Sequence, residues 1–187
     1  MKMNVLLTSC GLETQVIESA FINMLTKAPS ETKAVFIPTA AISPDAIEVL
    51  PKCLNDLLKC GIKRENIFVY DLHDHIDSEL LQTYDVIYLC GGDPGYLLRR
   101  INEQGFGKVL QTFINQGGIV VGVSAGSMIF AADMPDNLGL LKCALDVHCG
   151  DESREKAGRY EKGREERIKL GNQQAILFEE NDMIIIE

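Results

Sequence analysis

Short apolar runs alternate with amphipathic stretches along most of this chain, and this alternation limits its fold more than any other feature. Residues 4–9, 33–38, 67–70, 86–90 and 119–123 are predicted strands. Helical spacing of apolar residues is found at 13–26, 45–59, 78–82, 95–103 and 106–116, and a further helix is expected from 127 to 131. Such alternation predicts an α/β three-layer sandwich, in which helices cover both faces of a mostly parallel sheet.

The C-terminal third has a weaker pattern. Residues 144–147 predict a short strand, and the densely charged stretch 151–166 predicts a solvated loop that leads into a helix through Leu170. A terminal hairpin is expected from 175–178 and 183–186. Because the sequence ends directly after 184–187, we expect either a further element or a homodimer partner to cover that edge. The 187 residues hold neither a repeat nor a long linker, which predicts a single domain over 1–187.

Charge and cysteine content limit the partners and the compartment. The net charge is −9, and an acidic body repels phosphate backbones, so we expect no nucleic-acid partner. No run approaches the ~20 apolar residues of a membrane-spanning helix, and no signal peptide is evident, so we expect no membrane partner and a cytoplasmic protein. The six cysteines show no CxxC spacing and are expected to be reduced thiols, most of them buried.

The strongest motif is Gly122-Val123-Ser124-Ala125-Gly126, which matches G-x-S-x-G. This motif forms a sharp strand-to-helix turn that exposes a nucleophilic serine, and the glycines permit close backbone approach. An apolar run precedes it and a helix-compatible stretch follows it, as the motif requires. Ser124 is therefore the candidate nucleophile, and the amide of Ala125 is one candidate donor to an oxyanion. The structural alternative is a glycine-rich turn in which Ser124 caps a helix.

A nucleophilic serine needs a base, and the chain has three histidines. His148 is the better candidate, because it follows a short predicted strand downstream of Ser124; a purely structural histidine is the alternative. His73 and His75 lie in a polar turn, and their H-x-H spacing would suit a metal, but without an evident third ligand we expect none. Spacing does not choose the acid that would orient the imidazole. The candidates are Asp133, Asp136, Asp146, Glu152, Glu179 and Glu180.

A second pair of glycines, Gly91-Gly92, follows the strand predicted at 86–90. The amide of Gly92 is the second candidate oxyanion donor, opposite Ala125. The same turn also has the residues of a helix start, with Asp93 as N-cap and Pro94 at the first helical position. Neither G-x-G-x-x-G nor a P-loop motif occurs, so we expect no nucleotide and no other cofactor.

Several segments together resemble the peptidase E family, dipeptidase E-type serine peptidases with a class I glutamine amidotransferase-like, flavodoxin-like fold. The segments that carry the resemblance are 36–40, 85–92, 122–127, 146–148, 164–168 and the hairpin around Glu180. Glutamine amidotransferases on this fold have a cysteine in the elbow. Because this chain has a serine there, it resembles the peptidases of this fold rather than the amidotransferases.

The resemblance implies that Ser124 is the nucleophile, that His148 is the base, and that Gly92 and Ala125 form the oxyanion hole. For the acid it implies either Asp133 or Glu180, and the short segment between Ser124 and His148 favours Glu180. Family members cleave dipeptides with an N-terminal aspartate or other small acidic peptides. For such a substrate, Arg164 and Arg167 are the candidates that would bind its carboxylate, with a solvated charge run as the alternative.

The function predicted from the sequence is therefore a serine peptidase that hydrolyses short peptides. The net charge and the Asp93-Pro94 that follows the glycine pair, where the family commonly has Asn-Thr, both disfavour an acidic substrate. One alternative is a non-catalytic small-molecule-binding or regulatory protein on the same fold. An α/β-hydrolase esterase is disfavoured because no HGGG-type loop is present. Cys149 as nucleophile is disfavoured because strand neighbours such as His148 and Cys149 point to opposite sides.

Overall fold

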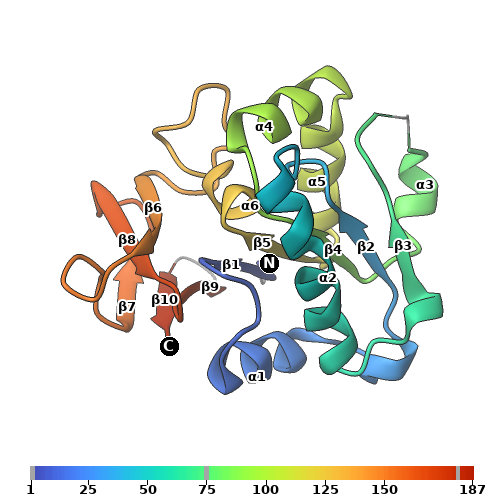
Figure 1. Cartoon of the computed structure of the whole chain (residues 1–187), viewed down its shortest axis with the longest axis horizontal. Helices are drawn as coiled ribbons and strands as arrows, with labels where there is room; N and C mark the ends of the chain where they lie inside the picture. Colours follow the sequence, from blue (N-terminus) through green and yellow to red (C-terminus); the bar gives the residue numbers. More distant parts are fainter. Residues whose placement is uncertain (1–2, 74–75, 180–181) are drawn as a thin grey trace.

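A computed structural model describes residues 3–73, 76–179 and 182–187, which form a large sheet, a small sheet and several helices (Figure 1). The strands of the large sheet are β1 (Val5–Thr8), β2 (Ala34–Ile37), β3 (Ile67–Val69), β4 (Val86–Leu89), β5 (Ile119–Val123), β7 (Gly158–Glu161), β9 (Ala175–Glu179) and β10 (Asp182–Ile186). Their order is β3-β2-β4-β5-β1-β9-β10-β7. The first five pair in parallel, and β9, β10 and β7 continue the sheet in antiparallel pairs.

Helices cover both faces of the parallel part, which confirms the predicted three-layer α/β sandwich. The helices are α1 (Gln15–Met24), α2 (Pro44–Lys59), α3 (Ser78–Leu81), α4 (Pro94–Glu103), α5 (Phe106–Asn115) and α6 (Ala125–Met128), with 3₁₀ turns at Pro29–Glu31 and Arg64–Asn66. Leu6 of β1 packs in the core under α1 and α2, whereas its neighbours Val5 and Leu7 pack in the core under α4, α5 and α6. Both faces of each parallel strand are thus buried, which explains why the sequence shows continuous apolar runs there.

The helix starts follow the capping residues that the sequence contains. The side chain of Ser43 accepts from the amide of Ala46, and that of Asp93 accepts from the amide of Tyr96, with a proline next in each case. The predicted N-cap role of Asp93 is confirmed, so this carboxylate is held at its own helix. It belongs to the first turn of α4, directly after the glycine pair.

The C-terminal third differs from the prediction in one respect. Residues 151–170 do not lead into a helix: they contain strand β7 and strand β8 (Arg167–Gly171), and β8 pairs with β6 (Ala144–Cys149) in the small sheet. The reason is the period-two alternation over 167–170, in which Ile168 and Leu170 are buried and Arg167 and Lys169 are more exposed. The charged residues around this short strand hide that alternation. The strand expected at 144–147 and the terminal hairpin are both present.

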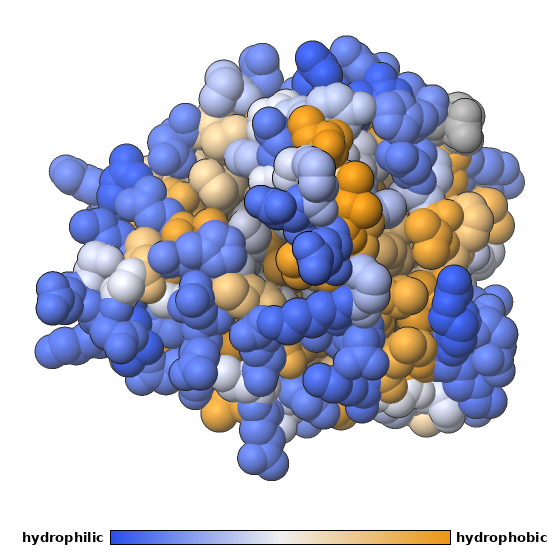
Figure 2. Space-filling model, viewed as in Figure 1, coloured by the Kyte–Doolittle hydropathy of each residue, from blue (hydrophilic) through white to orange (hydrophobic). Residues whose placement is uncertain are grey.

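The C-terminal strand is not an open edge. β10 pairs with β9 on one side and with β7 on the other, so the chain itself covers the strand that was expected to need an additional element or a partner. The opposite end of the sheet is β3, where Phe68 and Val69 are partly exposed. In Figure 2, hydrophobic surface gathers on this side of the visible face.

All six cysteines are unpaired, and Cys53, Cys60, Cys90 and Cys143 are buried, as expected for reduced core thiols. In the described ranges, no helix has the length and apolar character needed to cross a membrane.

Candidate active site

Three neighbouring strands of the sheet end at the same place. β5 lies between β4 and β1, so the residues that follow these strands meet at one edge. These residues are Ser124 after β5, Gly91-Gly92 after β4, and Ser9-Cys10 after β1. All of them line a pocket of about 240 Å³, which α2 closes on its other side. Pockets at the carboxyl ends of parallel strands are the usual ligand sites of such sheets.

Ser124 lies at the sharp turn between β5 and α6 with φ 49° and ψ −108°. A positive φ is rare for a residue with a side chain and occurs mainly where the surrounding structure enforces it. The elbow glycines allow this turn to be tight. A Cβ on Gly122 would lie 2.4 Å from the carbonyl oxygen of Gly126, and a Cβ on Gly126 would lie 2.4 Å from that of Leu89. The turn is thus the sharp strand-to-helix turn that the G-x-S-x-G motif predicts.

His148 reaches Ser124 from the small sheet. Its Nε2 lies 2.8 Å from Ser124 Oγ, within hydrogen-bond distance. The backbone of His148 also has a positive φ, 58°, and it falls where the register of β6 against β8 shifts between Asp146 and Cys149. Such a bulge changes the direction of a side chain. The His148 amide donates to Ser9 Oγ at 2.8 Å, which fixes this backbone to the end of β1.

The other ring nitrogen of His148 has two neighbours that are not among the residues predicted from the sequence. Nδ1 lies 3.3 Å from Cys10 Sγ and 3.3 Å from Asn172 Oδ1. Cys10 is detectable in principle, because it follows a predicted strand directly and strand ends are where ligands bind. Asn172 is not detectable from the sequence. The prediction places a helix before its turn, so the pattern does not indicate that this turn follows a strand.

Asp133, one of the two acids that the resemblance implies, lies elsewhere. Its carboxylate accepts from the amide of Leu145 at 3.4 Å and lies 3.7 Å from the guanidinium of Arg167. Leu145 precedes His148 by three strand residues, roughly 10 Å along an extended backbone. The structure therefore does not bring Asp133 to the His148 ring.

Glu180, the other implied acid, lies outside the described residues. The strand β9 precedes it. β9 begins with Ala175, which pairs with Thr8 at the carboxyl end of β1, and Leu177 then pairs with Leu6, nearer the start of β1. β9 therefore runs away from the edge that holds Ser124, towards its end at Glu179.

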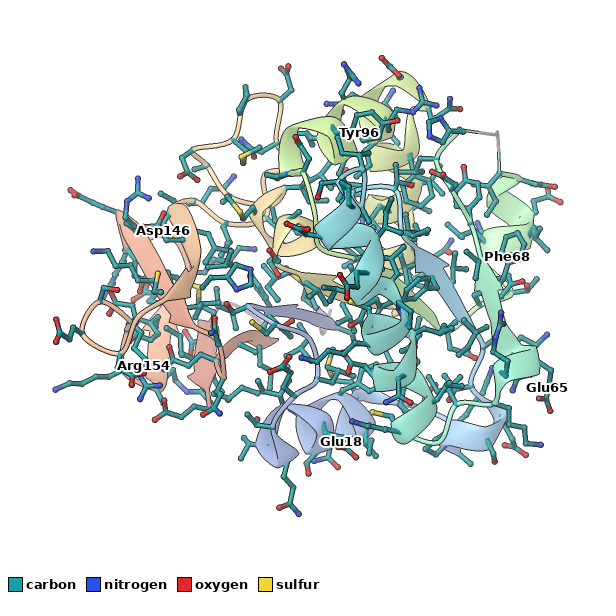
Figure 3. All side chains as sticks on the ribbon, in the orientation of Figure 1. Glu18, Glu65, Phe68, Tyr96, Asp146 and Arg154 are labelled. Atoms are coloured by element: carbon teal, nitrogen blue, oxygen red, sulfur yellow. The ribbon has the colours of Figure 1, made fainter. Side chains whose placement is uncertain are left out.

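Arg164 and Arg167, the expected substrate-binding residues, both have acidic partners. Arg164 lies 2.7 Å from Glu161, and Arg167 lies 2.5 Å from Asp146, another of the candidate acids. Asp146 lies on the small sheet, at the left of the molecule in Figure 3. Neither arginine is among the residues that line the pocket at Ser124.

Of the two candidate oxyanion donors, Ala125 directly follows Ser124 and Gly92 lines the same pocket. Ala125 is the first residue of α6, so its amide has no acceptor within that helix. Gly92 has φ 140°, and a Cβ there would lie 2.0 Å from the carbonyl oxygen of Ala40, so only glycine fits. Gly91 packs against Ser124, since a Cβ on it would lie 3.3 Å from that of the serine.

The charged residues of the pocket come from α2 and the segment before α1. Lys52 Nζ and Glu13 Oε1 are 2.5 Å apart, and this hydrogen bond raises the pKa of Lys52. Asp56 accepts from the amide of Leu12 at 3.0 Å and from the hydroxyl of Tyr88 at 2.8 Å, while burial raises its pKa. The Lys52–Glu13 pair adds no net charge to the pocket, and apolar side chains such as Val49 and Leu50 form part of its lining.

Cys149 and His73 are not among the residues that line this pocket. Cys149 is half-buried, and its Sγ lies 3.9 Å from the carbonyl oxygen of Val147. His73 Nε2 lies 3.2 Å from the hydroxyl of Tyr96, and His75 is outside the described residues. Within the described ranges, no group of three or more His, Cys, Asp or Glu side chains is arranged to hold a metal ion.

The fold and the site together define a class of protein: a flavodoxin-like α/β sandwich with a serine on a strained elbow and a histidine beside it. The family model for Peptidase family S51 matches residues 5–186, and the chain belongs to that family.

Two curated relatives match parts of the sequence. A Listeria innocua protein named uncharacterized peptidase Lin0382 is 31% identical over 100 residues, which cover 50% of this chain and 45% of the relative. Peptidase E of Shewanella amazonensis is 30% identical over 131 residues, 63% of this chain and 54% of the relative. The chain thus spans about half the length of the curated relatives that it matches.

Two crystal structures share the fold. A protein provisionally described as peptidase E from Listeria monocytogenes EGD-e superposes with a TM-score of 0.74 at 17% identity, over 100% of this chain and 99% of that one. A peptidase from an acI-B1 Actinobacterium gives 0.65 at 16% identity, over 99% and 88% of the chains. At these identities the likeness establishes the fold, and the peptidase E fold is the one predicted.

Proposed function

We propose that this protein is a serine peptidase that hydrolyses short peptides by acyl transfer. The observation that carries the proposal is the distance of 2.8 Å between Ser124 Oγ and His148 Nε2, with Ser124 held at positive φ on the elbow. A nucleophile in hydrogen-bond reach of a base is the arrangement that this chemistry requires. Membership of Peptidase family S51 supports the same conclusion.

In the proposed mechanism, His148 Nε2 accepts the proton of Ser124 as Oγ attacks the carbonyl carbon of the substrate. The carbonyl oxygen becomes an oxyanion, which the amides of Gly92 and Ala125 stabilise. The imidazolium then protonates the leaving amine and the peptide bond breaks, which leaves an acyl ester on Ser124. A water molecule, deprotonated by His148, hydrolyses the ester and restores the serine.

The pocket argues for a small substrate without a strong requirement for charge. Its volume of about 240 Å³ suits one or two residues rather than a long peptide. Arg164 and Arg167 are bound to acidic partners, and the cation beside the pocket, Lys52, is bound to Glu13. Cleavage of N-terminal aspartyl dipeptides would need one of these cations to exchange its partner for the substrate carboxylate. We therefore expect short peptides with small or aliphatic residues to be cleaved at least as well.

The test combines a fluorophosphonate probe with a library of dipeptides that includes aspartyl members. The wild type should be labelled and should release amino acids, and Ser124→Ala should do neither. Ser153→Ala, which alters an exposed serine, is the matched control and should retain both activities. An unlabelled, inactive wild type would instead support a non-catalytic small-molecule binder on the same fold.

A further inference from the structure

The ring of His148 can serve as a base only if its proton is on the correct nitrogen. Nε2 must be free of hydrogen to accept from Ser124 Oγ, so the proton of the neutral imidazole must sit on Nδ1. That N–H then needs an acceptor to hold the ring in place. In the described part of the chain, Asn172 Oδ1 and Cys10 Sγ lie 3.3 Å from Nδ1.

Of these two neighbours, the amide oxygen of Asn172 is the stronger acceptor. A thiol sulfur accepts hydrogen bonds weakly, whereas a side-chain amide oxygen has two lone pairs available. Burial raises the pKa of the Cys10 thiol, so its sulfur stays uncharged at neutral pH. The oxygen of Asn172 is thus the better partner for the N–H of His148.

The turn that holds Asn172 is fixed by the buried side chain of Gln174. Gln174 Oε1 accepts from the amide of Gly171 at 3.0 Å, and its Nε2 donates to the carbonyl oxygen of Glu155 at 2.8 Å and to the carboxylate of Glu187 at 2.9 Å. The backbone carbonyl of Gln174 accepts from the amide of Ser9 at 3.2 Å. Because the hydroxyl of Ser9 also binds the backbone of His148, the turn and the histidine are tied to the same strand end.

Four carboxylates in the described part of the chain have other partners. Asp133 and Asp146 bind Arg167, and Glu13 binds Lys52. Asp56 is turned towards the amide of Leu12 and the hydroxyl of Tyr88. We propose that Asn172 is the positioning residue of His148, so that an uncharged amide takes the place that a carboxylate has in a Ser-His-Asp triad. This inference rests on the proposed serine chemistry.

An amide and a carboxylate at this place differ in what they supply. Both accept from Nδ1–H and so fix the tautomer and the orientation of the ring. Only a carboxylate also stabilises the imidazolium by its charge. Besides His148 itself, the titratable groups that line the same pocket are Cys10, Glu13, Lys52, Cys53 and Asp56, and they stay the same when residue 172 is changed.

The experiment measures the rate at which a fluorophosphonate probe labels Ser124 in the wild type, in Asn172→Ala and in Asn172→Asp. The rate is followed from about pH 5 to about pH 10, a range that spans the titration of histidine. Asn172→Ala should lower the plateau rate about tenfold, since the ring loses its acceptor. Asn172→Asp should recover the plateau and move the acid limb of the profile to higher pH by about one unit, because the new carboxylate favours the imidazolium. Gln173→Ala, at the exposed neighbouring position of the turn, is the control and should match the wild type.

The competing partners are tested in the same series with Cys10→Ala, Asp133→Asn and Glu180→Gln. The proposal is overturned if Asn172→Ala is labelled at the wild-type rate, or if one of these three variants shows the loss in its place. It is also overturned if Asn172→Asp keeps the wild-type acid limb, since a merely structural role would leave the profile unmoved. A wild type that is not labelled on Ser124 would refute the proposed function itself, which separates the two failures.

Discussion

The elbow glycines offer the most demanding test of how this fold presents Ser124. A Cβ on Gly122 would lie 2.4 Å from the carbonyl oxygen, 2.8 Å from the carbonyl carbon and 3.0 Å from the amide nitrogen of the Gly126–Ser127 peptide. Every one of these atoms is backbone, so no side chain can rotate away to make room. Gly122→Ala should therefore shift the turn that carries Ser124.

The cost can be worked from this overlap. Inserting a methyl group into a packed interior destabilises a protein by about 1–3 kcal/mol, and the rigid backbone neighbours place this variant at the upper end. For a chain of this size, about 3 kcal/mol corresponds to a melting temperature about 6–12 °C lower. A displacement of the nucleophile by about 1 Å would slow the chemistry about a hundredfold.

The assay is thermal unfolding together with the rate of fluorophosphonate labelling. Gly95→Ala is the control, because the nearest atom to its Cβ would be a carboxylate oxygen of Asp93 at 3.4 Å, which is van der Waals contact, and the position is in the first turn of α4. That variant should melt at or above the wild-type temperature, since alanine favours helix, and should be labelled normally. If Gly122→Ala melted and reacted like the wild type, the tight elbow would not be what positions Ser124.

Three further outcomes follow from buried groups. Gln174→Ala should lower the free energy of unfolding by about 2–4 kcal/mol in urea titrations, because the amide of Gly171 and the carbonyl of Glu155 lose their partner; an unchanged midpoint would contradict this. Burial raises the pKa of Asp56 above its ordinary value of 3.8, so its contribution to stability is fully present below that pH and is lost as the pH rises through the raised pKa. Asp56→Asn should remove this loss from unfolding curves measured across acid pH, and a profile parallel to the wild type would refute it. Burial also raises the pKa of Cys60 to about 12 and that of Cys143 to about 11, so iodoacetamide at pH 8 should spare both thiols in the folded protein and modify them in urea, as read by peptide mass.

Much of the fold is predictable from the sequence because its signals are local. The apolar run at 119–123 matches β5 without a shift, since a strand buried on both faces has to be apolar throughout. The caps at Ser43 and Asp93 depend on neighbours only a few residues away. By contrast, β8 is short and carries charges on its exposed positions, so its period of two is lost among the surrounding charged residues.

The candidate site is predictable only in part, and for a related reason. Ser124 belongs to a local motif, and His148 follows a short apolar strand, so both are recognisable from their neighbours. The residues that orient His148 come from the end of β1 and from a turn near the C-terminus, over 20 residues from it in either direction. Only the register of the two sheets brings Cys10 and Asn172 to one ring nitrogen. The bulge in β6 that redirects His148 has no residue signature in the sequence.

Mapping the covalent adduct of a fluorophosphonate by peptide mass tests the central claim most directly, namely that Ser124 and His148 act together in acyl transfer. The account predicts one modified residue, Ser124, and loss of that modification when His148 is replaced by alanine. An adduct on another residue, or equal labelling of Ser124 in His148→Ala, would contradict it.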